Sequence, residues 1–120
     1  MNSLSRERLK ISGKDKLIYV AGPYRNSTEE GKRLNILHAI RVSCRLWELG
    51  WFVLCPHCNC ANFELFADVP DERYLEGGLA MLKGCQAVFM LKGWEKSQGS
   101  LMEHELAEKL GLQIYYEDSL

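Results

Sequence analysis

The chain has 120 residues and a formal net charge of −1 at pH 7. This length suits one domain with a single hydrophobic core and is too short for a second. The near-neutral charge excludes the basic surface typical of proteins that bind nucleic-acid polymers, and no apolar run approaches the ~20 residues that span a membrane. Residues 1–16 are polar and lack the apolar run of a signal peptide, which predicts a flexible tail before a cytoplasmic domain at 17–120.

The first half of the domain reads as strand, helix and strand. Residues 17–22 (LIYVAG) form a short apolar run ending in glycine, typical of a strand buried on both faces. Polar turn residues precede a helix predicted over 29–49, and Gly50 ends it. Residues 51–55 (WFVLC) predict the second strand, closed by proline. The helix's apolar spacing predicts an inward face made of Ile36, Leu37, Ile40, Cys44 and Trp47.

The second half continues the alternation. Residues 56–70 are polar, rich in turn formers and without periodicity, so we expect an irregular connection. A helix is predicted from Asp71, a strand over 87–91 (AVFML), a helix over 100–110 and a last strand over 112–116 (LQIYY). Alternating strands and helices predict an α/β fold whose parallel sheet has right-handed crossovers.

Three loops leave the carboxyl ends of the predicted strands, where open parallel sheets bind ligands. They begin at Gly22, Pro56 and Lys92. These loops carry the aromatic and hydrogen-bonding candidates for a ligand site, namely Tyr24, Arg25, His57, Asn59, Asn62, Trp94, Ser97 and Gly99. Such loops are polar in many proteins, so this grouping alone leaves the presence of a site open.

Five cysteines occur in the chain, and three of them fall in CPHCNC at residues 55–60. A Cys-x-x-Cys pair is half of a zinc site, but no second Cys/His pair stands at usable spacing. Cys44 and Cys85 stand in apolar surroundings typical of buried free cysteine. We therefore predict reduced thiols and neither a metal nor a cofactor.

The segment GWEKSQGSLMEHELA, residues 93–107, is the most informative. Ser97 and Gly99 stand where a helix begins, so backbone N–H groups there can meet an anion or a hydroxyl-rich ligand. Glu103 follows about one turn later, and Glu105 lies roughly 200° around the axis, so the two carboxylates cannot share a face. Glu103 is a catalytic candidate, or else only an acid stabilised by the helix dipole.

Three elements together, IYVAGPYR, the PHxN of CPHCN and GWEKSQGSLMEHELA, resemble the nucleoside 2-deoxyribosyltransferase-like superfamily, and within it a small uncharacterised phage and bacterial branch. The resemblance covers residues 17–116. It implies a flavodoxin/Rossmann-like three-layer sandwich with a parallel sheet of four to five strands. It also implies a homodimer or higher homo-oligomer in which a neighbouring subunit completes the site.

The resemblance also implies residue roles. Glu103 corresponds to the glutamate that attacks the anomeric carbon of a deoxyriboside, and a carboxylate suits an oxocarbenium-like transition state. Tyr24 is expected to orient that carboxylate. Ser97 and Gly99 match positions that contact the sugar or its 5′-phosphate. The remaining substrate-binding candidates are Gly22, Pro23, Arg25, His57, Asn59 and, for stacking on a base, Trp94.

The sequence departs from the family pattern at its proton donor. Active members carry an aspartate on the helix before the third strand, and Gly78 stands there, while Gln86 replaces another acid common just before that strand. Glu76 lies two residues earlier but is expected to point elsewhere on a regular helix. A lost general acid lowers a rate by ~10²–10⁴-fold.

Three functions therefore stay open at this point. The first is cleavage or transfer at the N-glycosidic bond of a (deoxy)nucleoside or nucleoside 5′-monophosphate through Glu103. The second is a non-catalytic domain that binds such a small molecule. The third is a protein-interaction module. Glu103 within an intact pattern favours the first, and Gly78 with Gln86 favours the second.

Overall fold

A computed structural model describes residues 16–119, so the predicted tail at 1–16 lies outside the described residues except for Lys16. The sheet has four parallel strands in the order β2-β1-β3-β4. The strands are β1 (Leu17–Ala21), β2 (Phe52–Leu54), β3 (Ala87–Met90) and β4 (Gln113–Tyr116). The predicted α/β fold with a parallel sheet is therefore confirmed, with four strands in the described residues.

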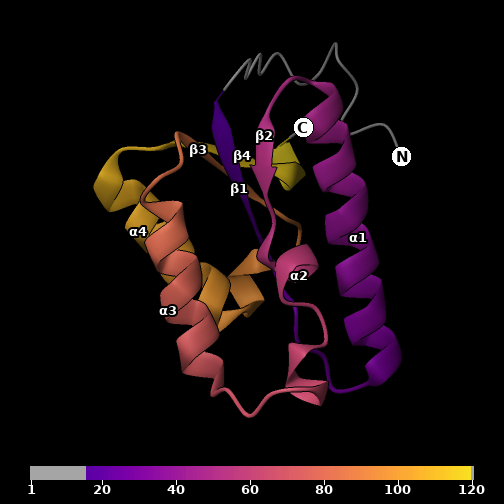
Figure 1. The fold of residues 1–120 in the computed structure, drawn as a ribbon. Coiled ribbons are helices and arrows are strands. Elements are labelled where there is room, and N and C mark those ends of the chain that lie inside the picture. The colour runs from indigo at the N-terminus through magenta and orange to yellow at the C-terminus, as the bar shows by residue number, and fades with distance from the viewer. Residues whose placement is uncertain (1–15, 120) are drawn as a thin grey trace.

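Helices cover both faces of this sheet (Figure 1). One face carries α1 (Glu29–Glu48), and the other carries α3 (Asp71–Leu82) and α4 (Gln98–Leu110). The connection after β2, predicted to be irregular, instead contains the short helix α2 (Pro56–Asn59) and the 3-10 turn η1 (Phe63–Leu65). Each is at most four residues long, too short to leave a periodic pattern in the sequence.

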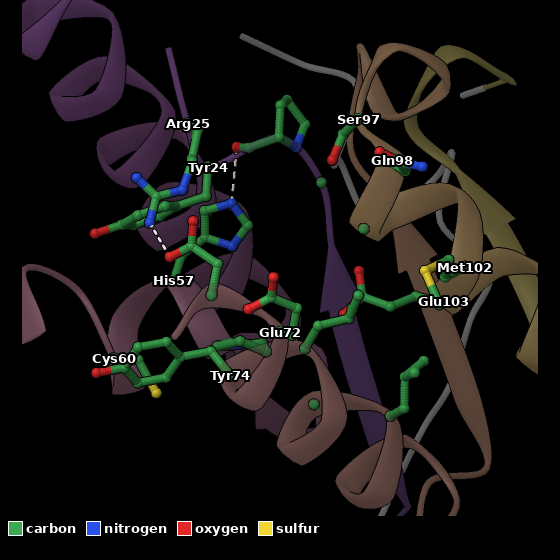
Figure 2. Close-up of a pocket in the computed structure, with 18 of the residues that line it drawn as sticks. Tyr24, Arg25, His57, Cys60, Glu72, Tyr74, Ser97, Gln98, Met102 and Glu103 are labelled. Carbon is green, nitrogen blue, oxygen red and sulfur yellow. Dashed lines mark hydrogen bonds and ion pairs between the residues drawn. The ribbon is translucent and has the colours of Figure 1, made fainter. Parts of the chain in front are cut away.

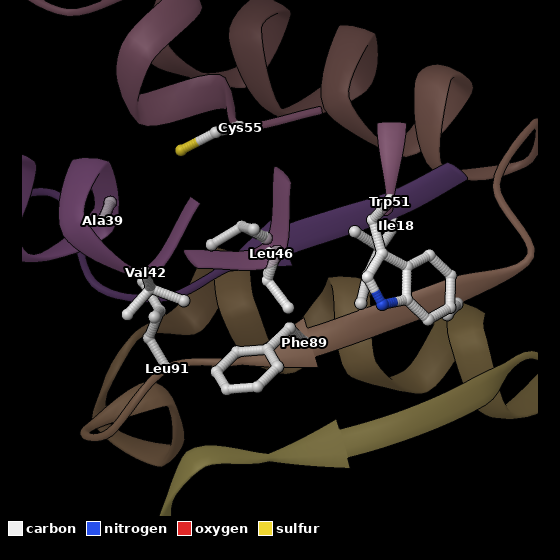
Figure 3. Close-up of a cluster of buried hydrophobic side chains, with 10 residues drawn as sticks. Ile18, Ala39, Val42, Leu46, Trp51, Cys55, Phe89 and Leu91 are labelled. Atoms are coloured by element: carbon white, nitrogen blue, oxygen red, sulfur yellow. The ribbon is translucent and has the colours of Figure 1, made fainter. Parts of the chain in front are cut away.

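The apolar core on the α1 face is built by alternate strand residues (Figure 3). Ile18, Val20 and Phe89 lie there with Leu46 of α1, all fully buried. The predicted helix is present, but its predicted inward face is wrong. The buried apolar positions of α1 are Ala39, Val42 and Leu46, whereas Ile40, Cys44 and Trp47 are exposed. A small residue such as alanine lets the helix pack closely against the sheet, so the inward face of α1 cannot be identified from hydrophobicity alone.

The sheet order places a switch point between β1 and β3, because the chain crosses from β1 to β2 on one side and reaches β3 on the other. The loops after β1 and β3 leave the sheet there in opposite directions, which opens a crevice at their carboxyl ends. Gly22 permits this close approach: a Cβ on it would stand 2.6 Å from the Leu91 side chain. Side-chain caps fix the first turns of the two helices that follow these loops. Thr28 Oγ1 accepts a hydrogen bond from Gly31 N at the start of α1, and Ser97 Oγ accepts one from Ser100 N at the start of α4.

Candidate active site

A pocket of about 840 Å³ occupies this crevice (Figure 2), a volume typical of sites for small molecules. Its walls come from the loop after β1, the segment 56–64, helix α3 and the start of α4. Eight of the ten predicted site residues line it, namely Gly22, Pro23, Tyr24, Arg25, His57, Ser97, Gly99 and Glu103. The loops of three strands thus converge on one hollow, as the parallel topology requires.

Two of these ten predicted residues are not part of the pocket wall, and neither is Asn62, the further candidate from the strand-end loops. Trp94, predicted to stack on a base, stacks on His104 with ring centroids 4.4 Å apart and also contacts Tyr116. Its ring packs against the apolar cluster beneath α4 instead of facing a ligand. Asn59 is exposed, and its amide donates to the Cys60 sulfur at 3.5 Å.

Glu103 faces the pocket from α4 and is only 8 % exposed. Glu105, two residues later, is exposed and pairs with Lys109 Nζ at 3.2 Å. The two carboxylates therefore lie on different faces of the helix, as their spacing predicts. A buried carboxylate needs hydrogen bonds or counter-charges to remain ionised, so the partners of Glu103 determine what it can do.

The hydroxyl that holds Glu103 belongs to Tyr19, not to Tyr24 as predicted. Tyr19 is fully buried in the middle of β1, and its Oη donates a short hydrogen bond to Glu103 Oε2. Burial, together with the adjacent carboxylate, raises the pKa of Tyr19 far above its ordinary value. The phenol therefore remains a hydrogen-bond donor at every working pH.

Burial also raises the pKa of Glu103, to about 7, although the Tyr19 hydrogen bond and the nearby His57 charge oppose this. Near neutral pH the carboxyl group thus exists in comparable amounts as acid and carboxylate. Because Tyr19 holds Oε2, the other oxygen, Oε1, has no protein partner among the described residues. A carboxylate with one fixed and one free oxygen can attack an electrophilic carbon or exchange a proton.

Gly78 explains how the Tyr19 phenol reaches Glu103. A Cβ at Gly78 would stand 2.5 Å from Tyr19 Oη and 3.6 Å from Glu103 Oε2. At Gly77, the neighbouring position, a Cβ would meet only Met81 Cε at 4.0 Å. The space beside Gly78 is therefore filled by the tyrosine hydroxyl, and any larger residue at 78 would displace it.

Tyr24 lines the pocket, but its hydroxyl bonds to the segment after β2 and not to Glu103. Its hydroxyl accepts a hydrogen bond from Asn62 N at 3.0 Å and lies 3.3 Å from Glu64 Oε1. Its ring meets His57 edge-on at 5.7 Å between centroids. Tyr24 thereby ties the loop after β1 to the backbone turn at Asn62, which adopts a left-handed conformation.

His57 is buried in the wall, and its Nε2–H donates to the Pro23 carbonyl at 2.8 Å. Burial lowers the pKa of His57, but the Cys55 thiol, the Pro23 carbonyl and the Glu103 charge outweigh it and raise the pKa overall. Ser97 caps helix α4, because its Oγ accepts a hydrogen bond from Ser100 N at 3.3 Å. Arg25 forms an ion pair with Asp71 across the mouth.

The sequence interpretation missed Tyr19 and the carboxylates of Glu64, Asp71 and Glu72 as wall residues. A signal for Tyr19 existed: a phenol in a strand buried on both faces needs a polar partner for its hydroxyl. No comparable signal marked the segment 56–72, because its short helices set which side chains turn inward.

Within residues 16–119, no group of three or more His, Cys, Asp or Glu side chains is placed to hold a metal ion, and no helix is long and apolar enough to cross a membrane.

Comparisons with known proteins agree with this architecture. A family model described as "Domain of unknown function (DUF4406)" matches residues 16–116. No curated protein matches the chain. Among solved structures, a 2-desoxiribosyltransferase from Leishmania mexicana matches with a TM-score of 0.58 and 19% sequence identity, over 84% of this chain. The match covers 63% of that protein, so this chain spans less than two thirds of its length. At this identity the likeness shows a shared fold.

Proposed function

Since the chain belongs to the DUF4406 family, which is defined without a function, we propose from its site that it cleaves or transfers the N-glycosidic bond of a (deoxy)nucleoside, with Glu103 as nucleophile. The observation that carries this proposal is the Tyr19–Glu103 pair at the floor of a pocket of about 840 Å³. The fold it shares with a 2-desoxiribosyltransferase, together with the Ser97, Gly99 and Glu103 pattern, gives further support.

In the proposed reaction Glu103 Oε1 attacks the anomeric carbon of the sugar. The bond from that carbon to the base nitrogen breaks, and its electron pair leaves with the base, which takes up a proton. The product is a glycosyl ester on Glu103. Water or a second base then attacks the same carbon and releases the carboxylate. Tyr19 is a positioning residue in this scheme, because it fixes Oε2 and leaves Oε1 without a protein partner among the described residues.

The proton for the leaving base needs a donor in place of the family's aspartate. Glu76 lines the pocket but is exposed and pairs with Arg73 at 3.3 Å. Glu72 is also exposed and lines the pocket from α3, but unlike Glu76 it makes no hydrogen bond or ion pair within residues 16–119 (Figure 2). Glu72 is therefore our candidate general acid, six residues before Gly78 on α3.

Most charged side chains of the pocket wall are already paired. Its wall carries five acidic side chains, Glu64, Asp71, Glu72, Glu76 and Glu103, against two basic ones, Arg25 and Lys96. Arg25 is already paired with Asp71. Lys32 likewise neutralises Glu64, and Arg73 neutralises Glu76, so Glu72, Glu103 and Lys96 are the charged wall residues without an ionic partner within residues 16–119. These charges leave both an uncharged nucleoside and its 5′-monophosphate as candidate substrates.

A second candidate function is binding without turnover, and Gly78 in place of the expected acid favours it. The deciding experiment incubates the protein with deoxynucleosides, ribonucleosides and their monophosphates and follows free base by chromatography. We expect base release from deoxynucleosides that is lost in Glu103→Gln and retained in Glu105→Gln, the exposed acid on the same helix. Absence of release together with a thermal shift on adding nucleoside would instead establish the binding function.

A further inference from the structure

The CPHC turn at residues 55–58 lies behind the pocket wall and is unused by the proposed reaction. Cys55 precedes α2 and Cys58 lies one turn on, with Cys58 N donating to Cys55 O at 3.0 Å. The two sulfurs are 3.2 Å apart. One helical turn keeps such residues within the Cα separation that a disulfide spans, so the bond needs a sulfur movement of about 1 Å and no rearrangement of the chain.

Polar groups without other partners surround the Cys55 sulfur. Ser43 Oγ and His57 Nδ1 are both buried, and neither makes a hydrogen bond of normal geometry. Both side chains interact with the Cys55 thiol, as does Cys58. Burial disfavours the thiolate, yet these three groups outweigh it and lower the pKa of Cys55. Ionisation of Cys55 would give the orphaned hydroxyl and imidazole the acceptor that they lack.

Cys58 differs from Cys55 in that it is exposed. Partial burial and the neighbouring Cys55 raise the pKa of Cys58 to about 12, so Cys55 ionises before Cys58. Thiol–disulfide exchange requires an accessible sulfur and a thiolate, and in this pair Cys58 supplies the access while the adjacent Cys55 can take up its proton. No metal competes for these sulfurs within the described residues, because no suitable third ligand is placed near them.

We propose that Cys55 and Cys58 form a redox-active dithiol that small-molecule disulfides oxidise to an intramolecular disulfide, and that its oxidation state is transmitted to the pocket through His57. Cys58 passes its proton to the adjacent Cys55 thiolate as its sulfur attacks one sulfur of the small disulfide, which expels one thiolate and leaves a mixed disulfide on Cys58. Cys55 then loses that proton to solvent and attacks the Cys58 sulfur, which expels the second thiolate. The protein loses two electrons and two protons, and the small disulfide becomes two thiols.

His57 links the two cysteines to the pocket wall. His57 stands between the two cysteines, contacts the Cys55 thiol and donates from Nε2 to Pro23 O in the pocket wall. Disulfide formation shortens the sulfur separation from 3.2 Å to about 2.05 Å and removes the ionisable Cys55 thiol beside the imidazole. The His57 ring therefore loses one of the groups that raise its pKa.

The test equilibrates the full chain in buffers of graded glutathione disulfide to glutathione ratio, then blocks free thiols with an alkylating reagent and maps them by mass spectrometry. We expect Cys55 and Cys58 to lose alkylation together and form one intramolecular disulfide. Cys58→Ser must abolish it, whereas Cys44→Ser and Cys60→Ser must retain it. Alkylation of both residues at every ratio, or a disulfide that survives Cys58→Ser, overturns the proposal.

The coupling to the pocket has its own readout, independent of any enzymatic activity. Titration of the His57 imidazole by NMR should give a lower pKa in the oxidised protein than in the reduced one, with no such change in Cys58→Ser exposed to the same buffers. An unchanged His57 titration after complete oxidation would overturn the transmission to the pocket. Because neither readout uses nucleosides, failure here is distinguishable from failure of the proposed glycosidic function.

Discussion

The two faces of strand β1 show how one strand serves two purposes. Ile18 and Val20 point to the α1 face and pack in its apolar cluster. Tyr19, between them, points to the α3 and α4 face and ends in a hydroxyl bonded to the buried Glu103 carboxyl. All three residues are fully buried, so burial alone does not distinguish them.

The two faces differ in how they contribute to the stability of the fold. The α1 face removes apolar surface from water and thereby stabilises the fold. The opposite face keeps an acid with a raised pKa and a glycine where a larger residue would clash. Ionising such an acid costs stability, which is typical of a site organised for chemistry. Each prediction below alters one face and asks whether the other is affected.

Glu103→Gln should give the largest effect, a loss of base release of at least ~10³-fold, because the amide cannot form the glycosyl ester. Initial rates on deoxynucleosides measure this, with Glu105→Gln as control. A variant retaining more than a tenth of the wild-type rate would contradict a nucleophilic role.

The same substitution should leave the α1 face intact and remove a pH dependence of stability. The Glu103 pKa is raised from 4.5 to about 7, so the native state holds its proton more tightly than the unfolded chain. Its stabilising contribution is therefore present below pH 4.5 and is lost as pH rises through 7, a difference of about 3 kcal/mol. Urea unfolding should show wild type losing stability relative to Glu103→Gln over this window. Parallel curves would contradict the raised pKa.

Leu46→Ala tests the opposite face. It opens a cavity in the apolar core under α1, and we expect a loss of about 2–5 kcal/mol in the free energy of unfolding. Since Leu46 lies on the far side of the sheet, the rate per folded molecule should stay within a factor of two. Urea denaturation and a rate assay well below the midpoint measure both, and a tenfold slower folded enzyme would show that the faces are not separable.

Tyr19→Phe keeps the packing of β1 and removes only the hydroxyl that holds Glu103. A hydrogen bond to a charged group contributes about 1.5–3 kcal/mol, so the pKa of Glu103 should rise by roughly one to two units. We expect the acid limb of the pH–rate profile to move upward by that amount and the rate at pH 7 to fall ~5–50-fold, in proportion to the ionised fraction of Glu103. Tyr24→Phe is the matched control, with the limb unmoved.

Gly78→Ala and Gly77→Ala should give the smallest effects, of opposite sign. Alanine in a helix interior stabilises by about 0.5–1 kcal/mol over glycine, and Gly77→Ala should gain this. At Gly78 the new Cβ would displace the Tyr19 hydroxyl, so that variant should lose both stability and rate. The melting temperatures and reaction rates of the two variants test this. If Gly78→Ala gained as much stability as Gly77→Ala and kept its rate, Gly78 would not have the role assigned to it.

Sequence reasoning predicted the apolar strands, the three long helices and the parallel pairing of the strands, because hydrophobic periodicity and glycine stops are local signals. It also predicted Glu103 and seven further wall residues, since the carboxyl ends of the strands meet at one edge.

It could not predict which phenol reaches Glu103. That depends on the register of β1 beneath α4 and on the space left at Gly78, both of which are tertiary properties. Trp94 illustrates the same limit: its position in a strand-end loop suggested a ligand, but stacking on His104 turns it toward the core.

The most direct measurement of the central claim is the mass of the protein after incubation with a 2-fluoro-2-deoxyarabinosyl nucleoside, whose fluorine slows hydrolysis of a glycosyl ester. The account predicts one added fluorosugar per chain, mapped to Glu103 and absent in Glu103→Gln. A protein that releases base from natural deoxynucleosides yet carries the sugar on another residue, or carries none, would contradict it.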